Sequence, residues 1–133
     1  MSAVGVDTHS IVWYLVNDKR LSARAVNALE LAAQTGNAIY VPSICLVELT
    51  YLVEKGKLPS IAPTRLIQAL DDPSVACKLA PLDRAVVDAL PSVDRHEIPD
   101  LPDRIVAATA VALRVPLISR DAKIQASSVQ TIW

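Results

Sequence analysis

The sequence predicts an α/β fold with a mostly parallel sheet. Short apolar segments of strand length alternate with longer segments of helical character along the chain, which is typical of such folds. The composition agrees, because 52% of the residues are hydrophobic, and this suits strands buried on both faces or a surface covered by a partner. No internal repeat, low-complexity tract or domain boundary is visible, so residues 1–133 are expected to form one domain.

The first part of the chain is expected to contain two strands and four helices. Ser22 is a suitable N-cap for a helix that continues to Thr35, where Gly36 and Asn37 end it. The expected elements, in order, are the strand Ala3–Val6, the helix Thr8–Val16, the helix Ser22–Thr35, the strand Ala38–Val41, the helix Pro42–Lys55 and the helix Pro63–Leu70.

The second part of the chain is expected to contain three strands and two helices. Three of the nine prolines fall within Pro91–Pro102, so this stretch is predicted to be an irregular loop. The remaining elements, in order, are the strand Val75–Leu79, the helix Asp83–Leu90, the helix Asp103–Leu113, the strand Leu117–Ser119 and a final strand near Val129–Ile132. In open α/β sheets, ligands bind beyond the carboxyl ends of the strands.

Four acidic residues lie where the local sequence gives a carboxylate little reason to be. Asp7 and Asp121 follow apolar strands, whereas Glu48 and Asp103 lie on the apolar faces of predicted helices. A buried carboxylate is unfavourable unless it is paired, hydrogen-bonded or bound to a metal. The topology can bring all four to one edge of the sheet, where each pair at about 4 Å would repel by about 4 kcal/mol. A divalent cation relieves that repulsion, and an all-oxygen ligand set favours Mg²⁺ or Mn²⁺ over zinc.

Each of these acids also has a purely structural interpretation. Asp7 and Asp121 suit the N-caps of the helical segments that follow them. Asp103 suits the first turn of a helix capped by Asp100, where the helix dipole favours an acid. Glu48 can instead form a buried pair with an arginine. Taken together, the four acids favour a metal site of the kind that hydrolyses phosphodiesters.

Charge, cysteines and hydrophobic segments restrict the class of protein further. The net charge of −1 gives no global sign of nucleic-acid binding, so such a contact needs a local basic patch. Cys45 and Cys77 fit no metal-ligand spacing and lie in apolar segments, so they are expected to be buried free thiols. No signal peptide or membrane-spanning segment is evident, so a cytoplasmic location is expected, with no membrane partner.

Four ordered segments of the chain carry a resemblance to a known family. They are Val6–Trp13, Val47–Leu49, Asp100–Ala110 and Leu117–Asp121. Together they resemble the PIN domain and, more narrowly, the VapC-type toxins of bacterial type II toxin–antitoxin systems. The resemblance spans nearly the whole chain, and it implies a three-layer α/β/α fold with a central, mostly parallel sheet of four to five strands.

The resemblance implies a metal-dependent endoribonuclease with an acidic quartet at its site. The implied catalytic and metal-binding residues are Asp7, Glu48, Asp103 and Asp121, and the supporting hydroxyl groups are those of Thr8 and Ser119. On this hypothesis, the three aspartates hold one or two Mg²⁺ or Mn²⁺ ions directly or through water. The glutamate orients a ligand water that attacks the RNA backbone, leaving 5′-phosphate and 3′-hydroxyl ends.

Several neighbours of the quartet are candidates for supporting roles. Arg104 and Arg120 adjoin two of the acids and are expected either to contact RNA phosphates or to pair with nearby carboxylates. His9 is expected near the site without a catalytic role, and Asp100 is interpreted as a helix cap. Trp13 is interpreted as a core or protein-interface residue.

The resemblance also implies partners. These are an RNA substrate, a small antitoxin whose C-terminal segment occupies the active-site groove, and a second copy of the chain in a homodimer. The alternative is a PIN-like module that binds RNA or protein without cleaving it. The presence of all four acids argues against a simple loss of catalysis.

Overall fold

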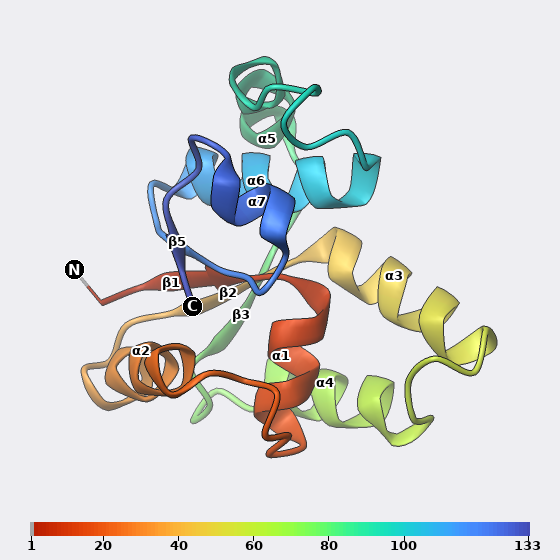
Figure 1. The fold of residues 1–133 in the computed structure, drawn as a ribbon. Coiled ribbons are helices and arrows are strands. Elements are labelled where there is room, and N and C mark those ends of the chain that lie inside the picture. Colours follow the sequence, from red (N-terminus) through yellow and green to blue (C-terminus); the bar gives the residue numbers. More distant parts are fainter. Residues whose placement is uncertain (1) are drawn as a thin grey trace.

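A five-stranded parallel sheet forms the centre of the computed structural model, which describes residues 2–133 (Figure 1). Every strand pair in it is parallel, and the strand order is β3-β2-β1-β4-β5. The strands are β1 (Val4–Val6), β2 (Ile39–Pro42), β3 (Cys77–Ala80), β4 (Leu117–Ile118) and β5 (Thr131–Ile132). The predicted α/β fold with a sheet of four to five strands is confirmed.

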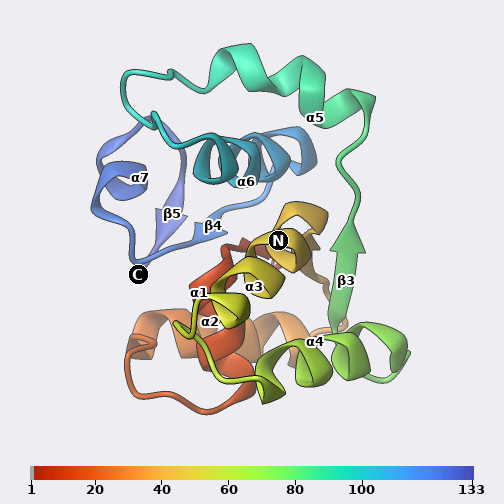
Figure 2. The same cartoon turned by 90° about the vertical axis from the view of Figure 1, so that its right-hand side faces the viewer.

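Helices cover both faces of the sheet and make a three-layer structure (Figures 1 and 2). The helices are α1 (Thr8–Leu15), α2 (Ala23–Gln34), α3 (Ser43–Glu54), α4 (Ile61–Asp71), α5 (Arg84–Ala89), the 3₁₀ turn η1 (Leu90–Ser92), α6 (Leu101–Leu113) and α7 (Ala122–Ala126). One layer contains α1, α2 and α4, and the opposite layer contains α5, α6 and α7. Helix α3 leaves the end of β2 and contacts α1 and α4 on one side and α6 on the other.

Local signals place the ends of the helices as the sequence predicted. The hydroxyl of Ser22 accepts a hydrogen bond from the backbone N–H of Ala25 at 3.1 Å and so caps α2. Gly36 follows that helix with φ +72°, a left-handed conformation that glycine adopts without strain. The predicted buried thiols are also confirmed, since Cys45 and Cys77 are both free and buried.

Four predicted starts are wrong by about two residues. Helix α4 begins at Ile61 instead of Pro63, and β5 begins at Thr131 instead of near Val129. The third strand begins at Cys77 instead of Val75, because pairing with β2 sets its register from Ile39↔Cys77 onward. Helix α6 begins at Leu101 instead of Asp103, because Pro102 is tolerated in a first turn, where its missing N–H would have no helical partner. The preceding stretch is not wholly irregular, since it starts within η1.

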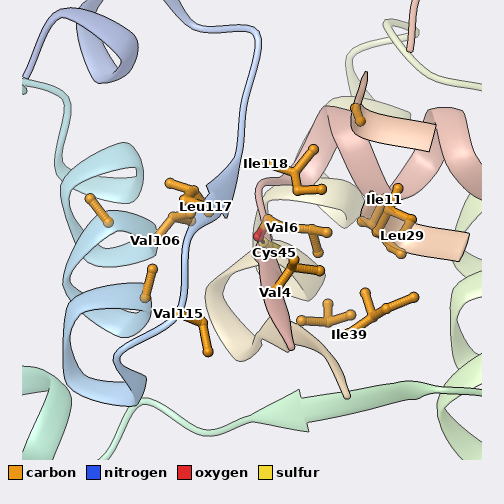
Figure 3. Close-up of a cluster of buried hydrophobic side chains, with 14 of the residues drawn as sticks. Val4, Val6, Ile11, Leu29, Ile39, Cys45, Val106, Val115, Leu117 and Ile118 are labelled. Atoms are coloured by element: carbon orange, nitrogen blue, oxygen red, sulfur yellow. Dashed lines mark hydrogen bonds between the residues drawn. The ribbon is translucent and has the colours of Figure 1, made fainter. Parts of the chain in front are cut away.

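The sheet centre is filled by side chains from β1 and β4, and helices cover it on both sides (Figure 3). Val6, Leu117 and Ile118 have no exposed surface, which agrees with strands buried on both faces. Val106 of α6 lies on one side of these strands, and Leu29 of α2 lies on the other. One contiguous hydrophobic cluster therefore joins the three layers.

The strand order places a topological switch point between β1 and β4. After β1 the chain continues to β2 and β3 on one side, whereas β4 and β5 fill the other side. Loops leaving the carboxyl ends at such a point diverge and leave a crevice, where open α/β sheets bind their ligands. Asp7 directly follows β1, and Asp121 follows β4 after two residues, so both acids lie at this crevice.

No helix in the described part of the chain has the length and hydropathy needed to cross a membrane.

Candidate active site

An acidic pocket of about 520 Å³ lies beyond the carboxyl ends of β1 and β4. Its carboxylates are those of Asp7, Glu48, Asp100, Asp103 and Asp121. They come from four separate segments: the start of α1, the middle of α3, the first turn of α6 and the start of α7. The four acids singled out in the sequence are therefore brought together, as the topology predicted.

Asp7 and Asp121 each cap a helix with a single carboxylate oxygen. Asp7 Oδ1 accepts a hydrogen bond from the N–H of Ser10 at 3.0 Å. Asp121 Oδ1 accepts from the N–H groups of Lys123 at 2.9 Å and Ile124 at 3.0 Å. Within residues 2–133, the Oδ2 atom of neither aspartate has a hydrogen-bond donor. The capping interpretation is confirmed, and it leaves one oxygen of each residue available to a ligand.

Glu48 is held by a hydroxyl group and has no arginine partner. The Oγ1 of Thr8, which is 4% exposed, donates to Glu48 Oε1 at 2.9 Å. Burial raises the pKa of the Glu48 carboxyl above its usual value, and the charges of Asp100 and Asp7 add to the rise. The Thr8 hydroxyl and His9 oppose it. The alternative of a buried pair with arginine is wrong for Glu48.

Asp103 is the acid most affected by the cluster. Burial raises its pKa to about 7, and the charges of Asp100, Asp121, Glu48 and Asp7 contribute in that order. Asp100 is exposed, and its Oδ1 accepts from the N–H of Asp103 at 3.0 Å. The interpretation of Asp100 as the cap of α6 is therefore confirmed, although its charge also acts on the pocket.

Ser119 supports the loop that carries Asp121. The serine is fully buried, and its Oγ accepts a hydrogen bond from the backbone N–H of Asp121 at 3.1 Å. Its own N–H bonds to the carbonyl of Ile132 at 3.4 Å, which joins the loop to β5. Both hydroxyl residues indicated by the sequence, Thr8 and Ser119, thus contact a candidate site acid directly.

The two arginines next to the site acids have different surroundings. Arg104 donates from Nε to the carbonyl of Val93 at 2.8 Å and from Nη2 to the carbonyl of Leu90 at 3.1 Å. It ties the loop before α6 to that helix, does not line the pocket, and forms no ion pair with a carboxylate within the described residues. Arg120 does line the pocket and forms no ion pair within the described residues.

Trp13 and Arg20 also line the pocket, and sequence reasoning missed both. Trp13 is buried, so its core interpretation is confirmed, but one edge of it reaches the cavity. Arg20 lies in a polar turn, where its guanidinium binds Asp18 through Nε at 3.0 Å and Nη2 at 2.7 Å and holds the pKa of Asp18 at about 2. No periodicity or motif in the sequence connects Arg20 with the acids, whereas Trp13 ends the segment Val6–Trp13, which also contains Asp7.

The pocket offers the oxygen ligands that hard divalent cations prefer. As arranged in residues 2–133, no three acidic, histidine or cysteine side chains are close enough together to hold a metal ion by themselves. Burial and the charges of neighbouring carboxylates nevertheless raise the pKa of Asp103, and the Oδ2 atoms of Asp7 and Asp121 are free to accept a ligand. Because Mg²⁺ keeps several of its waters and needs only one or two carboxylates, the residues fit a hydrated Mg²⁺ or Mn²⁺ ion.

The raised pKa of Asp103 predicts that the metal-free protein loses stability as the pH rises. Unfolded Asp103 ionises near its usual value of 3.8, but the folded residue stays protonated up to about pH 7. The folded state therefore binds more protons in this range, and the free energy of unfolding decreases with pH. We expect the Tm measured in EDTA to fall between about pH 4 and pH 7 and then to level off.

The control for this pH dependence is Asp103→Asn, which has no titrating group at that position. Its Tm should change less than that of the wild type over the same pH range. Mn²⁺ should raise the wild-type Tm most at high pH, where the carboxylate is ionised. If the Tm of the wild type and that of Asp103→Asn change equally with pH, Asp103 is not the group that causes the pH dependence of stability.

Comparisons with known proteins agree with this geometry. A family model described as the PIN domain matches residues 4–128. A chain of VapBC2 from Rickettsia felis, solved bound to a DNA fragment from its promoter, has a TM-score of 0.69 and 21% identity, covering 97% of this chain and 96% of that one. A chain of a toxin–antitoxin complex from Klebsiella pneumoniae has a TM-score of 0.61 and 25% identity, covering 92% and 90%.

No curated protein sequence matches the chain. The family model, however, spans nearly all of the chain, from β1 to the segment before β5. The parallel five-stranded sheet and the acidic pocket at its carboxyl edge agree with that match. The chain is a member of the PIN domain family.

Proposed function

We propose that this protein is a metal-dependent endoribonuclease and the toxin of a toxin–antitoxin pair. The observation that carries the proposal is the convergence of four carboxylates, from four separate segments, on one pocket of a PIN domain. The similarity to chains of two toxin–antitoxin complexes supports the toxin role. The alternative, a PIN-like module that binds without cleaving, is less favoured because all four acids are present and reach the same cavity.

The proposed reaction assigns a distinct task to each side chain. Asp7, Asp103 and Asp121 offer oxygens to Mg²⁺ or Mn²⁺, directly or through water. When bound, the cation polarises the scissile phosphate and makes a bound water more acidic. Glu48, with Oε1 fixed by Thr8, orients the water that attacks phosphorus. The bond from phosphorus to the 3′ oxygen breaks and that oxygen takes up a proton, leaving 5′-phosphate and 3′-hydroxyl ends.

The proposed partners are a small antitoxin and a second copy of the chain. Exposed apolar side chains on α3 adjoin the pocket: Val47 is 64% exposed and Tyr51 is 58% exposed, on either side of Glu48 in the sequence. A groove lined by these two residues, Ile44 and Pro102 borders the acids and suits an apolar segment of the antitoxin. We expect the purified toxin to be a dimer, which light scattering on a sizing column would test, and we expect it to act in the cytoplasm of its host.

Mapping RNA ends in cells tests the proposal without a guess at the substrate. The wild type and Asp103→Asn are expressed in a bacterial host without antitoxin, and new 5′-monophosphate ends are mapped across the transcriptome. Discrete new ends and growth arrest with the wild type only are expected. New ends carrying 2′,3′-cyclic phosphates would overturn the reaction. If soluble wild type gives no new ends, Mn²⁺ binding would indicate an enzyme whose RNA is absent from the host, whereas no Mn²⁺ binding would favour the non-cleaving module.

Thr8→Val is expected to slow cleavage about fivefold to tenfold while the fold is retained. Valine keeps the shape of threonine but cannot donate to Glu48 Oε1, and a lost hydrogen bond of about 1 kcal/mol corresponds to this change in rate. Initial rates on an RNA containing the mapped site, with circular dichroism melts, measure both effects. Thr8→Ser retains the hydroxyl and should cleave close to the wild-type rate. A loss of rate in Thr8→Ser but not in Thr8→Val would point to the methyl group instead of the hydroxyl.

A further inference from the structure

One wall of the acidic pocket is built from two arginines held on the ring of Trp13. The Cζ of Arg20 lies 5.0 Å from the ring centroid, and the Cζ of Arg120 lies 5.6 Å from it. Guanidinium groups at such distances are attracted to the indole face. All three residues line the same cavity as the candidate site acids. A single aromatic ring therefore brings together two cations from opposite ends of the chain.

Both guanidinium groups retain hydrogen-bond donors for a ligand. Arg20 uses Nε and Nη2 to bind Asp18, and its Nη1 has no acceptor within residues 2–133. Arg120 makes neither a side-chain hydrogen bond nor an ion pair within those residues, although Asp121 is its neighbour in sequence. Contact with Trp13 thus keeps the Arg120 guanidinium beside the carboxylates without neutralising it.

We infer that Arg20 and Arg120, positioned by Trp13, bind a backbone phosphate of the RNA strand adjacent to the phosphate that is cleaved. The inference rests on the proposed nuclease function. A polyanion entering a pocket with five carboxylates is repelled. Within residues 2–133, Arg20 and Arg120 are the only lysine or arginine residues that line this pocket. The planar guanidinium fork matches phosphate oxygens and holds a strand in register without reading its bases.

Trp13 acts through the arginines instead of touching the RNA itself. Its side chain is only 5% exposed, so it offers no free face on which a base can stack. Its indole Nε1 is buried and has no hydrogen-bond partner within the described residues, so replacing the ring leaves no protein acceptor unsatisfied. Trp13 is therefore a positioning residue, and its loss should affect RNA binding without a change in net charge.

The test measures RNA binding in a protein that cannot cleave. A fluorescein-labelled single-stranded RNA of mixed sequence is titrated with full-length Asp103→Asn protein at constant Mg²⁺ and several salt concentrations, and anisotropy gives the Kd. Adding Arg120→Gln is expected to weaken binding about tenfold. The slope of log affinity against log salt should become shallower by about 0.7, as for one lost phosphate contact on a single strand.

Two further variants separate positioning from charge. Trp13→Leu, added to the same protein, should also weaken binding and make the salt slope shallower, although it removes no charge. Trp13→Phe keeps an aromatic face, so its RNA affinity should lie between those of Trp13→Leu and of the Asp103→Asn parent protein. Melting curves exclude unfolding as the cause. Arg84→Gln is the matched control, because Arg84 lies on α5 outside the pocket with an 86% exposed side chain, and it should change neither affinity nor slope.

The outcomes distinguish this inference from the proposed function. Unchanged affinity and slope in Arg120→Gln, or an equal loss in Arg84→Gln, would overturn the phosphate site even if the wild type cleaves RNA. A loss of RNA affinity in Arg120→Gln and Trp13→Leu, but not in Arg84→Gln, would support the phosphate site even if the wild type cleaves nothing. In a cleaving wild-type background, Arg120→Gln should raise KM about tenfold and leave kcat nearly unchanged; a loss in kcat alone would contradict the inference.

Discussion

Asp103→Asn is expected to reduce RNA cleavage by purified protein at least about 100-fold. Asparagine has nearly the same shape, but it lacks the charge and the second carboxylate oxygen that a divalent cation needs. Residues that only orient metal ligands already contribute about 10-fold to 100-fold, so removal of a direct ligand should have a larger effect. Asp103 lines the same pocket as the other acids, and burial together with the charges of four of them raises its pKa.

The matched control for this variant is Asp83→Asn. Asp83 also precedes a helix, and its Oδ1 caps α5 by accepting from the N–H of Val86 at 3.2 Å. It does not line the acidic pocket, and asparagine caps helices about as well as aspartate, so cleavage should be unchanged. Initial rates are measured in Mg²⁺, in Mn²⁺ and in EDTA. Residual activity in Asp103→Asn above about one-tenth of the wild-type rate would place the metal site elsewhere.

Leu29→Ala is expected to have the largest effect on stability without a direct effect on chemistry. Leu29 is fully buried on α2, a helix that packs against β1, β2 and β5. Removal of such a side chain leaves a cavity and lowers the free energy of unfolding by about 2–5 kcal/mol. Urea unfolding monitored by circular dichroism measures this change, and cleavage per folded molecule should remain at the wild-type level.

Leu31→Ala on the same helix is the control for the core variant. The Leu31 side chain is 51% exposed, and substitutions at such positions usually change stability by less than about 0.5 kcal/mol. Similar losses of stability in Leu29→Ala and Leu31→Ala would show that the Leu29 face of α2 is not the one packed against the sheet. A large loss in Leu31→Ala alone would indicate that a second chain covers this face of the helix.

Most elements could be predicted because their signals are local. The caps at Ser22 and Asp121 and the left-handed Gly36 depend on residues only a few positions away. The start of β3 could not be predicted in this way, because pairing with Ile39 sets it. The proline-rich pattern predicts that Pro102 ends a loop, although proline suits the first turn of α6 equally well.

The candidate acids were visible in the sequence because a carboxylate on an apolar face is unusual. Their neighbours were harder to interpret, since adjacency in a helix does not mean a shared direction. Successive residues of an α-helix point about 100° apart, so Asp103 faces the pocket while Arg104 reaches the carbonyls of Leu90 and Val93. Arg120 precedes α7 instead of lying within it, and it does reach the pocket.

Sequence alone predicted the order of the strands and of helices α1 to α6, a mostly parallel sheet and the four candidate acids, since periodicity, capping and unexpected polarity are properties of short segments. Packing alone revealed that Trp13 of α1 lines the pocket with Arg20 and Arg120 on its ring. Likewise, the hydroxyl of Thr8 meets Glu48 only when α1 and α3 are side by side. Such contacts join segments far apart in the chain, and their geometry depends on how the sheet and its helices assemble.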